Sequence, residues 1–185
     1  MGNIREGIVL RNLDVVSKAL LLLFYVDDKK PIRRTTHLQK EMFVLGQKYD
    51  DLAEKTEFQP SFYGPDSEKV REAYDRLESL GLVSNFTFVQ NDFNERIVQV
   101  VKQEKGFDMG DFSLLKHNYE NMNNQELIAY IYSRYPEYIT DSLIVSDFEK
   151  NRVKVAVSLY KKNVVSLSRA LEIAGLTFKE FRGYL

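Results

Sequence analysis

Residues 166–181, SLSRALEIAGLTFKEF, carry the clearest structural signal in the chain. Apolar residues at positions i, i+3, i+4 and i+7 predict a short helix that begins after Ser166. We expect Gly175 to end this helix, because glycine readily adopts the left-handed conformation found after helix C-termini. Thr177 and Glu180 are spaced as a capping box for a second helix. The stretch therefore predicts a small helix-turn-helix.

A longer helix is expected just upstream, over residues 147–162, with Ser146 and Glu149 as its capping box. At 100° per residue, three of its lysines fall in one narrow stripe. These lysines are Lys150, Lys154 and Lys161.

Charge is distributed unevenly along the chain. From residue 150 onward there are eight basic and two acidic residues, a net charge of +6. The whole chain carries −1, so the remainder carries −7. We therefore expect the last quarter of the chain to meet any polyanion. The candidate nucleic-acid-binding residues are Lys150, Lys154, Lys161, Arg169, Lys179 and Arg182.

The amino-terminal part predicts helices followed by a hairpin. The expected elements are helices over residues 12–26, 36–49 and 67–80 and strands over residues 82–89 and 96–101. Thr36 and Gln39 form a capping box for the second helix, and Asp66 or Ser67 caps the third. This order is typical of a winged helix.

The rest of the chain follows as a connector and one more helix. Residues 102–122, with Gly106 and Gly110, are expected to be the connector, and a helix over residues 124–135 should stop at Pro136. We place a domain boundary near Ser142. The predicted fold class is thus mainly α with a small β-hairpin: a winged-helix-like domain over residues 1–141, then a basic helix-turn-helix unit over residues 142–185.

Tyr63-Gly64-Pro65 is the strongest break in periodicity. A fixed backbone geometry is expected at Gly64. We favour a purely structural role, a tight turn that places the third helix, over a functional one. The predicted structural-motif residues are Tyr63, Gly64, Pro65, Ser67 and Gly175.

Enzymatic chemistry finds little support in these residues. The chain has no cysteine, and its two histidines, His37 and His117, are far apart in sequence. We found no phosphate loop, zinc-protease motif or nucleophile elbow. We therefore expect no catalytic residue, no metal and no cofactor.

The most apolar run, residues 19–26, is eight residues long, whereas a membrane-spanning helix needs about 20. The sequence therefore predicts a protein without a membrane partner. Nothing in the sequence targets it elsewhere, and a cytoplasmic location is expected.

The predicted third helix has a surplus of acidic residues, and the expected hairpin tip adds Asp92 and Glu95 against Arg96. Since phosphate neutralisation by Lys and Arg supplies most non-specific affinity, such a surface would repel DNA. The amino-terminal region is therefore expected to bind protein instead.

Two resemblances add to these expectations. Residues 58–67, FQPSFYGPDS, followed by Leu80-Gly81-Leu82-Val83, resemble the YwgA-like family, itself related to the Panacea-type domains of SocA-like antitoxins. The helix ending in residues 132–137, YSRYPE, extends this resemblance to about residues 12–140. Residues 156–181 are similar to a family of small prokaryotic antitoxin-like proteins with a helix-turn-helix, although Leu171 replaces the usual alanine. Neither resemblance implies a catalytic residue.

The leading hypothesis is a prokaryotic DNA-binding regulator, a homodimer that contacts double-stranded DNA through its carboxy-terminal unit. The amino-terminal region would supply the dimer or effector surface. The alternative is an antitoxin-like interaction module that neutralises a toxin partner, with the basic end as a dimer clamp or an autoregulatory element. A third possibility is an unrecognised enzyme that uses carboxylates and tyrosines in a deep pocket.

Overall fold

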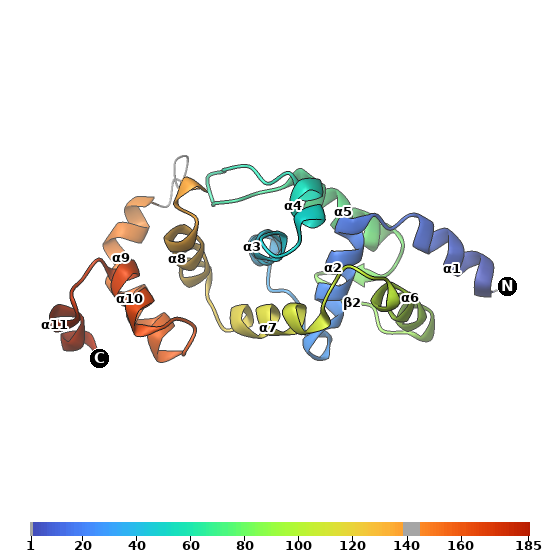
Figure 1. The fold of residues 1–185 in the computed structure, drawn as a ribbon. Coiled ribbons are helices and arrows are strands. Elements are labelled where there is room, and N and C mark those ends of the chain that lie inside the picture. The colour runs from blue at the N-terminus through green and yellow to red at the C-terminus, as the bar shows by residue number, and fades with distance from the viewer. Residues whose placement is uncertain (1, 139–144) are drawn as a thin grey trace. The chain divides into compact units, whose positions relative to one another are not determined.

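The computed structural model describes residues 2–138 and 145–185, which are mainly helical with one two-stranded antiparallel sheet (Figure 1). The mainly helical fold with a small β-hairpin is thereby confirmed. The chain forms two compact units. The amino-terminal unit comprises Met1–Phe58 and Ser67–Glu120, and the carboxy-terminal unit comprises Gln59–Asp66 and Asn121–Leu185. The predicted boundary near Ser142 lies outside the described residues.

The amino-terminal unit is built around helix α2, whose residues 19–24 are at most 1% exposed. Its elements are α1 (Gly2–Arg11), α2 (Val15–Tyr25), η1 (Asp27–Lys29), α3 (Thr35–Gly46), α4 (Asp50–Thr56), α5 (Glu68–Ser79), β1 (Val83–Ser84), β2 (Thr87–Phe88), α6 (Asp92–Gln103) and α7 (Met109–Glu120). Helices α4, α5, α6 and α7 all contact α2. Asp14 begins α2 by accepting a hydrogen bond from the Ser17 N–H at 2.8 Å. The apolar run of the sequence is thus the core helix of this unit.

Helix α3 begins differently from the prediction. It starts at Thr35 without a side-chain cap, so the capping box expected at Thr36 and Gln39 is wrong. The Gln39 amide instead donates to the Ser67 carbonyl at 2.9 Å and accepts from the Ser67 N–H at 3.0 Å. Ser67 caps α5 as predicted, accepting from the Val70 N–H at 3.1 Å.

The predicted second strand, residues 96–101, is wrong, because these residues lie within α6. The predicted first strand, residues 82–89, is also wrong as a single strand, because it contains both strands of the sheet, which pairs Val83–Ser84 with Thr87–Phe88. Asn85 and Phe86 form the turn with φ angles of 48° and 58°, the positive values that a two-residue hairpin loop of type I′ requires. The β-branched residues near 97–101 favoured a strand by propensity. A helix forms here instead of a strand, and its local sequence signal is Asn91, whose side chain caps the start of α6.

The predicted connector over residues 102–122 is also wrong in part, since it contains α7. Phe112, Leu115, Lys116 and Tyr119 are its buried residues, at the i, i+3, i+4, i+7 spacing of a helix face. Lys116 at a core position obscured this pattern, because lysine is almost never fully buried without partners.

The carboxy-terminal unit contains α8 (Asn124–Arg134), η2 (Pro136–Tyr138), α9 (Val145–Lys161), α10 (Leu167–Ala174), α11 (Phe178–Phe181) and η3 (Arg182–Tyr184). Helices α8, α9 and α10 pack against one another. The helices expected at these places are confirmed. Because α9 already begins at Val145, the predicted cap residue Ser146 lies inside it, and its side chain is outside the described residues.

Candidate nucleic-acid interface

The lysine stripe of α9 faces solvent. Lys150, Lys154 and Lys161 are exposed, whereas Val155 and Leu159 of the same helix are buried. At 100° per residue the buried positions lie on the side of α9 opposite the three lysines. The stripe is about 16 Å long, from eleven residues at 1.5 Å each. The three ammonium groups are therefore presented on one side of a single rigid helix.

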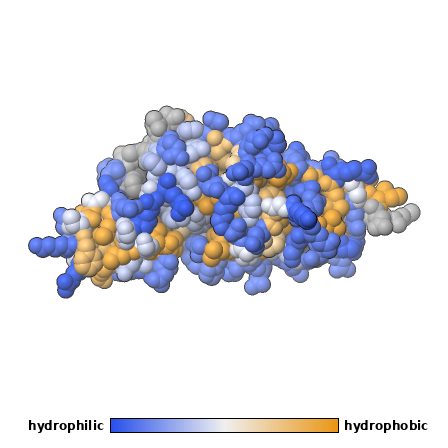
Figure 2. Space-filling model, viewed as in Figure 1, coloured by the Kyte–Doolittle hydropathy of each residue, from blue (hydrophilic) through white to orange (hydrophobic). Residues whose placement is uncertain are grey.

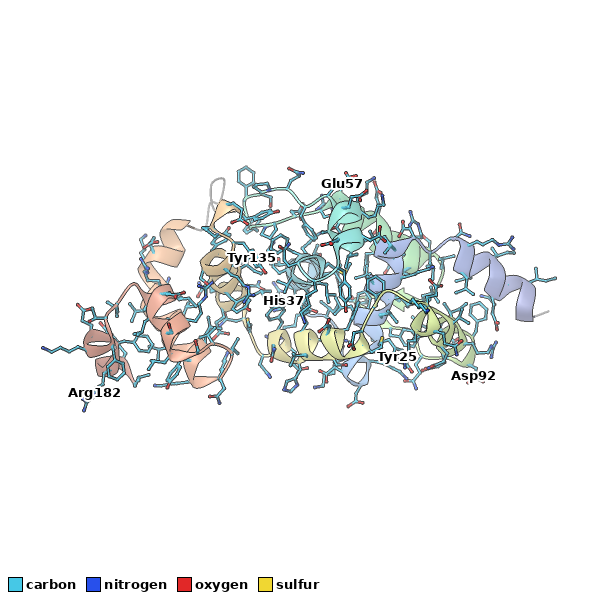
Figure 3. All side chains as sticks on the ribbon, in the orientation of Figure 1. Tyr25, His37, Glu57, Asp92, Tyr135 and Arg182 are labelled. Atoms are coloured by element: carbon cyan, nitrogen blue, oxygen red, sulfur yellow. The ribbon has the colours of Figure 1, made fainter. Side chains whose placement is uncertain are left out.

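Lys179 and Arg182 lie on the last two short helices. Both are exposed, and Figure 3 shows the Arg182 side chain extending outward from the end of the chain. Phe181, between them, is fully buried and meets the Tyr160 ring edge-to-face at 6.4 Å. This contact anchors α11 to α9, so that Lys179 and Arg182 are carried on the same packed unit as the lysine stripe.

The local signals that position these residues are confirmed. Ser166 caps α10, and Thr177 with Glu180 forms a capping box at the start of α11. Hydrogen bonds from the Thr177 side chain and backbone lower the pKa of Glu180 below its usual value. Gly175 lies between the two helices with a φ of 65°, the left-handed conformation expected of a glycine that ends a helix.

Arg169 differs from the other predicted binding residues because it already has a partner. Its guanidinium forms an ion pair with Glu172, one turn further along α10. Together with Arg134 and Ser168 it lines a depression of about 500 Å³. Arg169 can reach an anion there only in competition with Glu172.

The described acids from Glu149 onward are all engaged. Glu149 pairs with Arg152 at 3.0 Å, Glu172 pairs with Arg169, and Glu180 caps α11. By contrast, five cations of the same stretch form no ion pair with a described residue. They are Lys150, Lys154, Lys161, Lys179 and Arg182.

Two further cations serve the fold. Lys162 pairs with the buried Glu126 at 2.7 Å. Burial alone would raise the pKa of Glu126, but hydrogen bonds from Lys162 and Ser158 lower it below its usual value. Arg152 donates from Nε to the Ile173 carbonyl at 3.0 Å, at the end of α10. The eight basic residues counted from the sequence thus divide into three held by partners and five open to solvent.

The Tyr63-Gly64-Pro65 segment forms a tight turn. Gln59 and Asp66 exchange two backbone hydrogen bonds of 2.9 Å each, and the Gly64 N–H donates to the Ser61 carbonyl at 3.0 Å. Gly64 has a φ of 85°, which favours glycine. The fixed geometry expected at this position is observed. Tyr63 is 57% exposed at its tip.

The histidines do not meet. His37 is buried in α3, inside the amino-terminal unit (Figure 3), and His117 is exposed on α7. Over the described residues no group of three or more His, Cys, Asp or Glu side chains is placed to hold a metal ion. Nor does any described helix have the length and apolar character needed to cross a membrane.

Sequence reasoning missed one charged cluster altogether. Lys116 of α7 is 2% exposed and donates to the carbonyls of Leu23, Phe24 and Val26 at 3.0–3.3 Å. It thereby caps the end of α2, whose last carbonyls have no helical partner. Burial raises the pKa of Glu41, also on the inside of this unit, to about 8. Burial lowers the pKa of Lys116 to about 8.

No protein-family model, curated protein or solved structure matches this chain. The residues and the geometry of the two units are therefore the basis for assigning a function.

Proposed function

We propose that this protein is a non-catalytic, DNA-binding regulator whose carboxy-terminal unit binds the phosphate backbone. One observation carries the proposal: from Glu149 onward, five exposed cations form no ion pair with a described residue, while the described acids of the same stretch are all engaged. Cations without partners can neutralise phosphates and release counterions, which supplies most non-specific affinity for DNA. We also propose that the protein is a cytoplasmic homodimer. The resemblances to two antitoxin-like families support the same function.

The shortness of the last two helices limits how many DNA bases the carboxy-terminal unit can contact. Helix α11 has four residues and is followed by a single 3₁₀ turn. A recognition helix normally places several side chains against base edges. On α11 and η3, only Lys179 and Arg182 are proposed to contact base edges. Contacts to the DNA phosphate backbone should therefore dominate the affinity.

The amino-terminal unit is a weaker candidate for DNA. The three cations of α5, the third helix expected of a winged helix, all form ion pairs: Lys69 with Glu72, Arg71 with Glu68, and Arg76 with Asp14. An incoming phosphate would have to displace these carboxylates. We assign this unit to protein or effector binding.

One specific feature favours the alternative, an antitoxin-like module that binds a toxin protein. Phe178 of α11, Tyr184 of η3 and Leu185, which follows η3, are 52%, 57% and 48% exposed. Figure 2 shows hydrophobic and hydrophilic surface side by side at this end of the chain. Exposed aromatic residues among cations are typical of protein interfaces as well as of nucleic-acid ones.

The test is fluorescence anisotropy of the full chain with labelled double-stranded DNA over a range of salt concentrations. We expect replacing Lys150, Lys154 and Lys161 together by Gln to weaken binding about 10- to 100-fold. The slope of log affinity against log salt should flatten by about 0.9 for each phosphate that a lysine no longer neutralises.

The matched control is the triple replacement of Lys48, Lys55 and Lys69 by Gln. These lysines are 49%, 53% and 45% exposed, and each forms an ion pair. Both triple variants change the net charge equally, so a difference between them measures where DNA binds. Equally weakened binding in both variants would overturn the assignment, and a protein that ignores DNA but binds a toxin partner would favour the alternative.

A further inference from the structure

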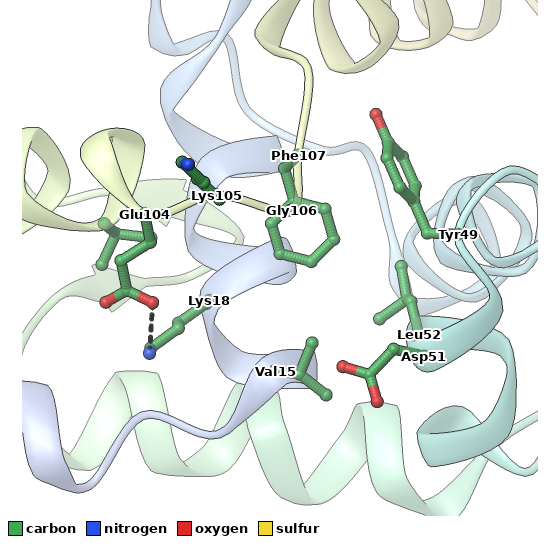
Figure 4. A pocket seen from close by; sticks show the side chains of 10 residues that line it. Val15, Lys18, Tyr49, Asp51, Leu52, Glu104, Lys105, Gly106 and Phe107 are labelled. Atoms are coloured by element: carbon green, nitrogen blue, oxygen red, sulfur yellow. Dashed lines mark hydrogen bonds and ion pairs between the residues drawn. The ribbon is translucent and has the colours of Figure 1, made fainter.

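The amino-terminal unit contains a cavity of about 270 Å³ between α2, α4 and the loop that joins α6 to α7 (Figure 4). Its apolar lining comes from Val15, Leu52, Val101 and Phe107. Ligand pockets are typically about 300–1,000 Å³, so this one suits a small ligand.

The loop that forms one wall is held in place by specific contacts. Gly106 has a φ of 146°, in a region open essentially to glycine. The Phe107 ring meets the Tyr49 ring edge-to-face at 5.1 Å and the Phe112 ring at 5.4 Å. The Tyr49 hydroxyl donates to Asp111 at 2.8 Å and accepts from the Asp108 N–H at 3.0 Å. These contacts fix the Phe107 ring beside the cavity.

The charges of the lining are not equivalent. Lys18 and Glu104 form an ion pair of 2.6 Å and neutralise each other. Asp51 forms no ion pair with a described residue, and Lys55, one helical turn later, pairs with Glu54 at 2.7 Å. In Figure 4 the Asp51 carboxylate lies beside Val15, across from the Lys18–Glu104 pair. An exposed carboxylate without an ion-pair partner among the described residues thus lies beside the apolar Val15 in the lining of the cavity.

We infer that this cavity binds a small organic amine with an aromatic or branched aliphatic body. The ammonium group would meet Asp51, and the body would lie against Phe107, Val15 and Leu52. Aromatic rings at the cavity favour the same sign of charge, because their faces attract cations. Lys105 lines the cavity next to Glu104 and would form an ion pair with a carboxylate if the ligand also carries one. The inference is independent of DNA binding, since it concerns the other unit.

The test uses three probes of similar size on the full chain, observed by NMR chemical-shift changes and by isothermal titration calorimetry. The probes are 2-phenylethylamine, phenylalanine and phenylacetate. We expect the amine to bind, the amino acid to bind at least as tightly because Lys105 can meet its carboxylate, and phenylacetate to bind at least tenfold more weakly than the amine. Shifts should concentrate at α4 and at the loop that carries Phe107.

Asp51→Asn should weaken amine binding at least tenfold, because the charged partner is removed. Asp50→Asn is the matched control, since Asp50 is also exposed in the first turn of α4 but does not line the cavity; it should leave affinity unchanged. Phe107→Leu should weaken the aromatic amine and retain an aliphatic one such as isoamylamine. The inference is overturned if phenylacetate binds as well as the amine, if Asp50→Asn and Asp51→Asn behave alike, or if no shifts appear at 10 mM amine (roughly the weakest binding of use).

Discussion

The two units use their ionisable side chains differently. In the amino-terminal unit they hold helices: Lys116 caps α2, and Arg76 pairs with Asp14 at the opposite end of the same helix. In the carboxy-terminal unit, Arg152 and Lys162 serve the fold, whereas the α9 stripe, Lys179 and Arg182 do not. Charge that already has a partner contributes to stability, and charge without one is available to a ligand.

This difference means that net charge alone is a poor guide to a binding surface. Both units are rich in Lys and Arg, yet the ion pairs separate the cations that an external phosphate could engage from those that it could not. Surface ion pairs are worth little to stability, about 0–1 kcal/mol each. Their consequence here is for binding, because a paired cation must first leave its carboxylate.

The buried Glu41 should make the stability of the amino-terminal unit strongly dependent on pH. Its pKa of about 8 in the folded protein lies above its usual value because of burial, with Lys116 opposing and Glu120 adding to the rise. Between the unfolded and folded pKa values, folding takes up a proton, so stability falls as pH rises from about 5 to 8. Lys116, with its pKa lowered to about 8, has the opposite effect and restores stability above pH 8.

Thermal unfolding followed by circular dichroism from pH 5 to 9 should therefore show decreasing stability up to about pH 8, by a few kcal/mol (about 1.4 kcal/mol per pH unit at most). Glu41→Gln removes the ionisable group and should make stability nearly independent of pH between about pH 5 and 8. The exposed carboxylate Glu54 provides the control, as Glu54→Gln should keep the pH dependence. If the stability of the wild type depends on pH as little as that of Glu41→Gln, Glu41 does not have a raised pKa in the folded protein.

The signals that were correctly interpreted from sequence are local ones. Ser67, Ser166 and the Thr177–Glu180 pair cap helices through hydrogen bonds to residues three positions away. Such bonds depend on the chain's own neighbours, so spacing in the sequence is enough to predict them. The lysine stripe of α9 followed from helical periodicity in the same way.

The signals that were misread depend on distant partners. Gln39 bonds to Ser67, 28 positions away, and Lys116 bonds to carbonyls 90 to 93 positions away. No spacing rule anticipates these contacts. Near residue 97, strand propensity was outweighed by the local Asn91 cap together with packing of the buried α6 face, because strand propensity is a weak guide where a face is buried. The cavity lined by Asp51 and Phe107 likewise brings together segments that are far apart in the chain.

Gly175 leaves room for the Arg152 guanidinium, which donates to the Ile173 carbonyl at the end of α10. Gly175 has a φ of 65°, and a Cβ there would overlap the Arg152 guanidinium. Gly175→Ala should destabilise the unit by about 2–3 kcal/mol, because left-handed strain is combined with disruption of the Arg152 hydrogen bond to Ile173. Hydrogen exchange of the α10 amides would localise the change.

Gly183→Ala is the control for this substitution, since a Cβ at Gly183 meets nothing within 4 Å. It should alter exchange in α10 by less than about 0.5 kcal/mol. If α10 is protected equally in the two variants, Arg152 has no such structural role at the end of α10.

The smallest expected effect is also the most direct test of whether pairing decides binding. Arg182 and Arg169 are in the same unit and carry the same charge, but Arg182 is exposed without a described ion-pair partner and Arg169 pairs with Glu172. Arg182→Gln should weaken DNA binding about three- to tenfold, or roughly 0.7–1.4 kcal/mol, and reduce the salt slope by about 0.9. Arg169→Gln should weaken binding less than about twofold, because the contact it could offer already costs the separation of an ion pair. Adding Glu172→Gln to the wild type releases Arg169, and this single change should tighten binding. If Arg169→Gln weakens binding as much as Arg182→Gln, the DNA displaces Glu172, and the depression that Arg169 lines is part of the contact surface.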